Sequence, residues 1–248
     1  MRRSFAVLHR GQRTPGNVPF ATTPRADAKP GPSRNGDHAT STDSEVRKLV
    51  QRVFILPETV RAPEAVAFCG ADSGAGCSWV CVCAAEVLAE QVTGTICVVD
   101  VNLRSPSLHE YLHTERAPGF AEILENSRPV REFARRERGN NLWLITAGAP
   151  GKSPEAALHP ARLRARFSEL RAEFDWVLVD TPPVCSYADA VLLGQLTDGI
   201  VLIVGSNSTR RESARIAKES FEAARIPMLG AVLNKRTYPI PEALYQKL

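Results

Sequence analysis

The sequence lacks the features of membrane-spanning, secreted and fibrous proteins. No apolar run approaches the ~20 residues needed to cross a bilayer, and the apolar stretch Phe5–Leu8 is too short for the hydrophobic region of a signal peptide. The six cysteines are scattered and do not show the spacing of a small disulfide-bonded domain. We therefore expect a soluble protein of a reducing compartment.

Most of the chain also lacks an excess of charge of one sign. The net charge is +4, and residues 1–44 carry seven basic side chains against three acidic ones. The other 204 residues therefore carry equal numbers of basic and acidic side chains. A folded part without net charge has no electrostatic footprint for nucleic acid, so we expect no nucleic-acid partner.

The composition changes near residue 42. Residues 1–42 are rich in Pro, Gly, Ser, Thr, Asn and Arg and have no apolar period, which predicts a disordered N-terminal tail. A helix start signal follows at Thr42-Asp43-Ser44-Glu45, and Pro57 ends that helix. We predict one folded domain over residues 43–248.

Beyond residue 64, short apolar runs alternate with longer amphipathic ones. The runs predict strands at 65–70, 95–101, 142–146, 176–180, 199–205 and 229–234. Helices are expected at 78–91, 154–173, 188–195 and 209–224. This alternation predicts a three-layer α/β fold, with a mostly parallel central sheet and helices on both faces. Ligands of such folds bind at the carboxyl ends of the strands.

A glycine-rich turn, Gly70–Trp79, connects the first predicted strand to the first long helix. Backbone N–H groups of such a turn converge on one point, and the helix dipole makes that point favourable for phosphate. Gly74 and Gly76 with a nearby hydroxyl favour a phosphate loop over a simple connecting turn.

Two aspartates stand at the ends of buried strands. Asp100 follows one apolar run and Asp180 follows another. A carboxylate at such a position is costly unless it is paired or faces a cation. We favour a Mg²⁺ site for both residues, and the alternative for each is that the side chain caps the following turn.

Five stretches resemble the bacterial tyrosine kinase (BY-kinase, CpsD/CapB) family of capsule and exopolysaccharide systems, within the MinD/ParA group of P-loop ATPases. They are 73–78, 98–112, 142–158, 174–193 and 197–248. The segments LRSPSLH and FDWVLVDTPPV are specific to this branch. The resemblance covers about residues 44–248 and implies a P-loop NTPase-like fold.

The resemblance also implies cofactors and site residues. ATP or ADP with Mg²⁺ would bind here, with Asp100 and Asp180 in the catalytic positions. The nucleotide would contact Gly74, Ala75, Gly76, Cys77, Ser78 and Trp79, and Asn234 would contact adenine. The metal would be bound by Ser78, Asp100 and Asp180.

Four positions depart from the family pattern, and all belong to this site. Cys77 stands where the family has lysine, Trp79 where it has a small hydroxyl residue, and Ala75 and Asn102 where it has acidic residues. A thiol cannot replace the lysine charge, whose loss costs roughly 1.5–3 kcal/mol. We therefore favour a degenerate pseudokinase.

Two alternatives to the pseudokinase stay open. One is an active tyrosine autokinase in which Arg104 or Lys152 replaces the lysine, and the other is a partitioning-type ATPase. A further hypothesis concerns Cys77, whose position at a helix N-terminus predicts a lowered thiol pKa and hence reactivity.

The resemblance further implies a cytoplasmic protein that a separate membrane partner, a Wzz-type chain-length determinant, recruits to the inner face of the membrane. It also implies a homo-oligomeric ring formed through a charged N-terminal helix, of which Glu45 and Lys48 fit the motif. Family members carry phosphorylated tyrosines near the C-terminus. Tyr238 and Tyr245 are the candidates here, with packing as the alternative role.

Overall fold

A seven-stranded sheet lies at the centre of the computed structural model, which describes residues 44–56, 62–137, 141–149, 158–206 and 208–235. The strand order is β3-β4-β2-β5-β1-β6-β7, and β3 pairs antiparallel with β4 while all other pairs are parallel. The strands are β1 (Ala65–Gly70), β2 (Ile96–Asp100), β3 (Arg135–Arg136), β4 (Leu142–Ile145), β5 (Trp176–Thr181), β6 (Gly199–Gly205) and β7 (Met228–Asn234).

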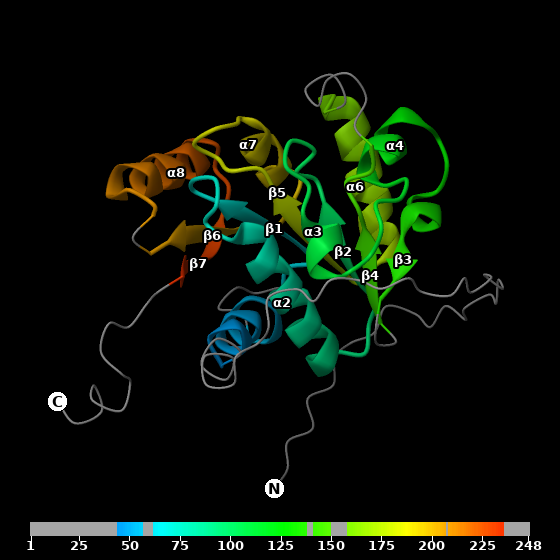
Figure 1. Cartoon of the computed structure of the whole chain (residues 1–248), viewed down its shortest axis with the longest axis horizontal. Helices are drawn as coiled ribbons and strands as arrows, with labels where there is room; N and C mark the ends of the chain where they lie inside the picture. The colour runs from blue at the N-terminus through cyan, green and yellow to red at the C-terminus, as the bar shows by residue number, and fades with distance from the viewer. Residues whose placement is uncertain (1–43, 57–61, 138–140, 150–157, 207, 236–248) are drawn as a thin grey trace, which may run out of the picture. The chain divides into compact units, whose positions relative to one another are not determined.

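Helices cover both faces of the sheet (Figure 1). The helical segment 44–50 and α2 pack on one face, and α4, α6, α7 and α8 pack on the other. The longer helices are α2 (Cys77–Gln91), α6 (Pro160–Glu173) and α8 (Arg211–Ala223), and the shorter ones are α3 (Leu108–Tyr111), α4 (Phe120–Glu125), α7 (Asp189–Gly194) and the 3-10 turn η2 (Val130–Phe133). The predicted three-layer α/β fold is confirmed.

The central strands are apolar because both of their faces are covered. Every residue of β1 and of β2 is buried, and so are five of the six residues of β5. Strands that alternate apolar and polar residues would place polar groups against one helical layer. This two-sided burial explains the apolar runs of the central strands, whereas the run of β7 is apolar although none of its residues is buried.

The helix boundaries differ in places from those expected. The helical segment 44–50 continues as a π-helical turn, Gln51–Ile55, in which the Leu56 N–H donates to the Gln51 carbonyl at 2.7 Å. Helix α6 begins at Pro160, and residues 158 and 159 before it are not helical, so it starts later than the expected residue 154; residues 154–157 lie outside the described residues. The predicted tail, residues 1–42, and Pro57 lie outside the described residues.

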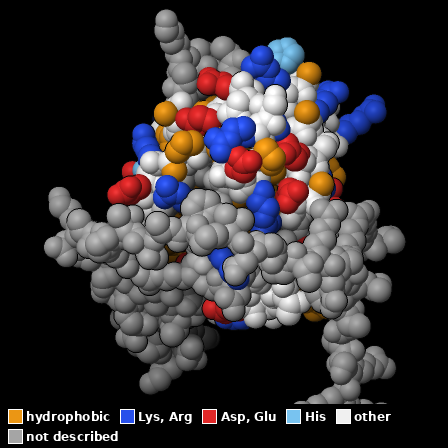
Figure 2. Space-filling model, turned by 90° about the vertical axis from the view of Figure 1, so that its right-hand side faces the viewer, with side chains coloured by type: hydrophobic (Ala, Val, Ile, Leu, Met, Phe, Trp, Pro, Cys, Tyr) orange, Lys and Arg blue, Asp and Glu red, His pale blue; other side chains and the backbone are white. Residues whose placement is uncertain are grey.

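The surface carries interspersed charges on the face shown in Figure 2, where Lys and Arg side chains alternate with Asp and Glu. Elsewhere on the surface, Arg215 of α8 makes ion pairs with Glu212 and Glu219 of the same helix. None of the helices in the described part of the chain has the length and apolar character required to span a membrane.

The packing of α6 on the sheet should depend on Phe167. This side chain is 2% exposed and its ring meets that of Phe120 edge-on, with centroids 6.2 Å apart. Phe167→Ala should lower the free energy of unfolding by about 3–5 kcal/mol because it leaves a cavity. Urea unfolding of the variant and of Ile216→Ala, an exposed change on α8, measures the difference. Equal losses in the two variants would contradict this account of the core.

Candidate functional site

The glycine-rich turn joins β1 to α2 at the carboxyl edge of the sheet. Gly74 and Gly76 have φ angles of 76° and 85°, which residues other than glycine rarely adopt. A Cβ on Gly76 would also collide with the Asn234 side chain. Both glycines are therefore required by the conformation of the turn, as expected for a phosphate loop.

The start of α2 is open to an anion. Gly76 is the N-cap residue and has no side chain that could accept from the first N–H groups of the helix, and the first turn contains no acidic residue. Those N–H groups lack intrahelical acceptors, and the helix dipole adds positive potential there. The segment Gly74–Trp79 therefore presents backbone donors in the arrangement that binds phosphate.

Two buried carboxyl groups lie beside this turn. Asp100 and Asp180 are register partners on the neighbouring strands β2 and β5, and both side chains are fully buried on the face that α2 covers. The carboxyl groups differ in their hydrogen bonds, which gives each a different role.

Asp100 is satisfied by the backbone. Its Oδ1 accepts from the Asn102 N–H, and its Oδ2 accepts from the N–H groups of Ser107 and Leu108, all at 3.1 Å. Burial raises the pKa of Asp100 to about 6, against the opposing effect of these donors. The three contacts are those of the turn-capping alternative, and they fix the segment that leads into α3.

Asp180 has no such donors. Neither of its oxygens has a hydrogen-bond partner of normal geometry among the described residues, although the Ser78 hydroxyl and the Cys77 thiol lie near enough to favour its charged form. Burial, with a further contribution from Asp100, raises the pKa of Asp180 to about 8. A buried carboxyl without a partner, next to a hydroxyl and a phosphate loop, is suited to a cation.

Cys77 does not have the lowered pKa that its place at a helix N-terminus predicted. Burial of the thiol, and then the nearby Asp180, raise the pKa of Cys77 well above its ordinary value. The thiol therefore stays neutral, and the expectation of a reactive thiolate is wrong because burial outweighs the helix dipole. Trp79, two residues on, is partly buried against the core on the α2 face.

The end of β7 reaches across to the phosphate loop. The Asn234 Nδ2 donates to the Ala75 carbonyl at 2.9 Å, and the Lys235 Nζ donates to the Gly74 carbonyl at 2.7 Å. Asn234 was expected at the adenine, and the structure places its amide against the loop. Lys235 was missed because it is 161 positions from Gly74 and no local pattern signals the contact.

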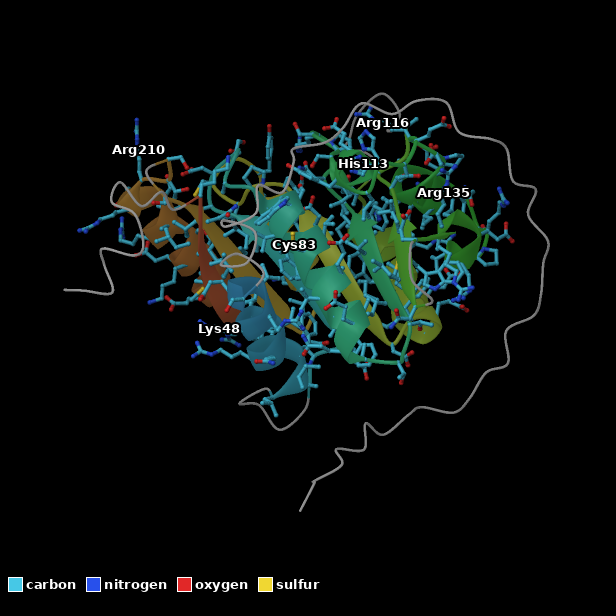
Figure 3. The ribbon with its side chains drawn as sticks, turned by 60° about the horizontal axis from the view of Figure 1, so that its bottom comes forward. Lys48, Cys83, His113, Arg116, Arg135 and Arg210 are labelled. Carbon is cyan, nitrogen blue, oxygen red and sulfur yellow. The ribbon has the colours of Figure 1, made fainter. Side chains whose placement is uncertain are left out.

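Of the two basic residues suggested as a substitute for the lysine, Arg104 is engaged elsewhere. The Arg104 guanidinium pairs with Asp189 at 3.0 Å and stacks on the Tyr187 ring at 4.1 Å from its centroid. Lys152 lies outside the described residues. Arg210, at the start of α8, points away from the ribbon (Figure 3).

Two further predictions concern the ring-forming residues Glu45 and Lys48 and the C-terminal tyrosines. Lys48 donates to Glu45 at 2.7 Å, within the same exposed helical segment, and its side chain projects from the segment in Figure 3. Tyr238 and Tyr245 lie outside the described residues.

The residues present fit a nucleotide with Mg²⁺. The uncapped N–H groups at the start of α2 suit phosphate, and the unpartnered Asp180 with the adjacent Ser78 suits a hard cation that prefers oxygen ligands. The described residues contain no cluster of three His, Cys, Asp or Glu side chains that could hold a metal alone. Magnesium sites of this kind complete their coordination with phosphate and water.

No family model matches the chain. Individual proteins do resemble it in sequence. The tyrosine-protein kinase YwqD of Bacillus subtilis is 27% identical over 226 residues, which cover 91% of this chain and 89% of that protein. The homologues are bacterial tyrosine kinases. For longer relatives the match is partial: the chain spans 22% of the tyrosine-protein kinase ptk of Acinetobacter johnsonii, at 26% identity over 64% of this chain.

Solved structures show the same fold. The kinase domain of the Escherichia coli tyrosine kinase ETK superposes with a TM-score of 0.71 at 22% identity, over 83% of this chain and 80% of that one. The septum site-determining protein MinD of Pyrococcus horikoshii, complexed with Mg-ADP, superposes with a TM-score of 0.59 at 16% identity, over 74% and 76% of the two chains. The predicted P-loop NTPase fold is thereby confirmed.

The raised pKa of Asp180 predicts that stability falls with increasing pH. The folded-state pKa of about 8 lies above the ordinary value of 3.8, so the native state keeps a proton that the unfolded state has lost. Between pH ~4 and ~8 the free energy of unfolding therefore decreases as pH rises. Asp180→Asn removes this titration and should stabilise the protein at pH ~8.5 by about 1–3 kcal/mol.

Urea unfolding at pH ~6 and ~8.5, without metal or nucleotide, measures this effect. Glu222→Gln, a change on the exposed surface of α8, serves as the control and should keep the wild-type pH dependence. A wild-type curve that is flat over this range, or an Asp180→Asn variant with the same slope, would show that Asp180 is ionised in the native state.

Proposed function

We propose that this chain is a BY-kinase-like regulator of capsule or exopolysaccharide biosynthesis that binds nucleotide and has weak or no phosphoryl-transfer activity. The observation that carries the proposal is the combination of a glycine turn with the backbone angles of a phosphate loop and an uncharged side chain, Cys77, where the kinase pattern has lysine. The loop supports nucleotide binding, and the Cys77 side chain lacks the positive charge that phosphoryl transfer needs.

Binding of Mg-ADP or Mg-ATP is supported by the backbone donors of the loop and by the oxygen ligands beside it. Ser78 and Asp180 would hold the metal, and Mg²⁺ would neutralise charge on the phosphate oxygens when bound. The MinD structure that shares this fold is a complex with Mg-ADP. The loop amides would orient the phosphates by the same donors that the start of α2 leaves without acceptors.

Loss of phosphoryl transfer follows from what surrounds the loop. This chemistry depends on positioning and on cations that stabilise the transition state. The position of the lysine is taken by Cys77, Asp100 is engaged with three backbone donors, and Asn102 stands in place of a second carboxylate. The Asn102 Oδ1 itself accepts from the Ser105 N–H at 3.2 Å, which fixes it in the turn.

The alternative of an active tyrosine autokinase is favoured by the homologues, which are named as tyrosine kinases. The two functions differ in one measurable product, phosphotyrosine. In either case we propose a cytoplasmic protein that forms homo-oligomers and is recruited to the membrane by a Wzz-type chain-length determinant. The support for this partner is the resemblance to the kinase family.

Calorimetric titration of Mg-ADP and Mg-ATP tests the binding site. We expect wild-type protein to bind both nucleotides weakly and Cys77→Lys to bind them roughly ten- to a hundredfold more tightly, because a charge-assisted hydrogen bond to phosphate is regained. Cys77→Ser, which adds no charge, is the matched control and should bind like wild type. Absence of heat with both wild type and Cys77→Lys would contradict a nucleotide site.

Immunoblotting for phosphotyrosine after incubation with Mg-ATP separates the regulator from the kinase. We expect no signal from wild-type protein above that of Asp180→Ala. A wild-type signal that Asp180→Ala abolishes would establish the autokinase instead.

A further inference from the structure

We infer that Lys235 supplies the positive charge for bound phosphate that Cys77 cannot supply. The inference rests on the proposed function, since it assumes that nucleotide binds at the loop. It assigns to Lys235 a binding role that local motifs do not indicate. Its basis is the contact of the Lys235 ammonium with the phosphate loop, the lack of an ion pair with any described carboxylate, and the presence of Cys77 where the kinase pattern has lysine.

The position of Lys235 is set by two backbone constraints. Strand β7 pairs with β6 up to Asn234, whose carbonyl accepts from the Ser206 N–H at 2.7 Å. The chain then turns at Lys235, which has a φ of 58°, and its N–H donates to the Asn234 Oδ1 at 2.8 Å. This turn directs the lysine toward the phosphate loop instead of continuing along the sheet.

The side chain then lies across the loop. Its Nζ donates to the Gly74 carbonyl at 2.7 Å, and its Cε is 3.6 Å from the point that a Cβ would occupy on Gly76. Gly76 is the N-cap of α2, so the ammonium stands next to the open N–H groups of that helix. An ammonium has three donors, of which the Gly74 carbonyl takes one.

No carboxylate of the described residues pairs with this ammonium. Lys235 is exposed and makes no ion pair with the described carboxylates, whereas Lys48 and Lys218 pair with glutamates on their own helices. A lysine stem is flexible, and an exposed ammonium can move a short distance onto a ligand at little cost. A phosphate at the loop would be the nearest anion.

Calorimetry with Mg-ADP, Mg-ATP and adenosine tests the inference. Lys235→Gln should weaken binding of both nucleotides about ten- to a hundredfold and leave adenosine unaffected, since adenosine has no phosphate. Lys235→Arg keeps the charge and should bind within a few-fold of wild type. Lys218→Gln, on the exposed surface of α8, is the matched control and should bind like wild type.

A double-mutant cycle with Cys77→Lys shows whether the Lys235 charge acts on bound phosphate or whether its side chain only holds the loop in place. If Lys235 replaces the missing charge, Lys235→Gln should cost much less affinity in the Cys77→Lys background than in wild type. An equal loss in both backgrounds, with a lower thermal midpoint of the unliganded variant, would make Lys235 a structural residue and overturn the inference.

The outcomes separate this inference from the proposed function. Nucleotide binding that is equal in wild type and Lys235→Gln overturns the inference alone and leaves the nucleotide site standing. Absence of nucleotide binding to wild type and to Cys77→Lys overturns the proposed function, and the inference with it.

Discussion

The parallel register of β2 with β5, and of β5 with β1, is the constraint on which the rest of the site depends. It sets Asp100 opposite Asp180 and brings the end of β1, where the glycine turn begins, to the same edge. Two buried carboxyl groups side by side destabilise the folded state unless their charge is offset. The sheet therefore places two carboxyl groups beside the start of α2, where their charge must be offset by hydrogen-bond donors, protons or a cation.

The protein supplies hydrogen-bond donors to the carboxyl group of Asp100 but not to that of Asp180. Backbone donors surround Asp100, so its charge stabilises a turn and the entry to α3. Asp180 keeps two oxygens without partners. Because buried polar groups in stable cores are normally hydrogen-bonded, the exception marks Asp180 as the group suited to a ligand, whereas Asp100 also holds a turn.

Much of this arrangement could be predicted from the sequence. Central strands that are buried on both faces consist of apolar runs, and turns with positive φ favour glycine. Strand β3 could not be predicted, since its two residues are exposed arginines that pair only at an edge. The direction of the pKa shift of Cys77 was predicted wrongly, because the sequence shows the helix terminus but neither the burial of the thiol nor its neighbour Asp180. Contacts from β7 depend on strand order, which no local pattern encodes.

Those contacts explain how the loop keeps its shape without the lysine of the kinase pattern. Gly74 and Gly76 permit the turn, and Asn234 and Lys235, at and just after the end of β7, donate hydrogen bonds to two of its carbonyls. The loop conformation is thus held by the protein itself, while the charge at position 77 acts only on a ligand. Shape and charge are thus separate properties of this site: the turn keeps the backbone angles of a phosphate loop although Cys77 stands where the kinase pattern has lysine.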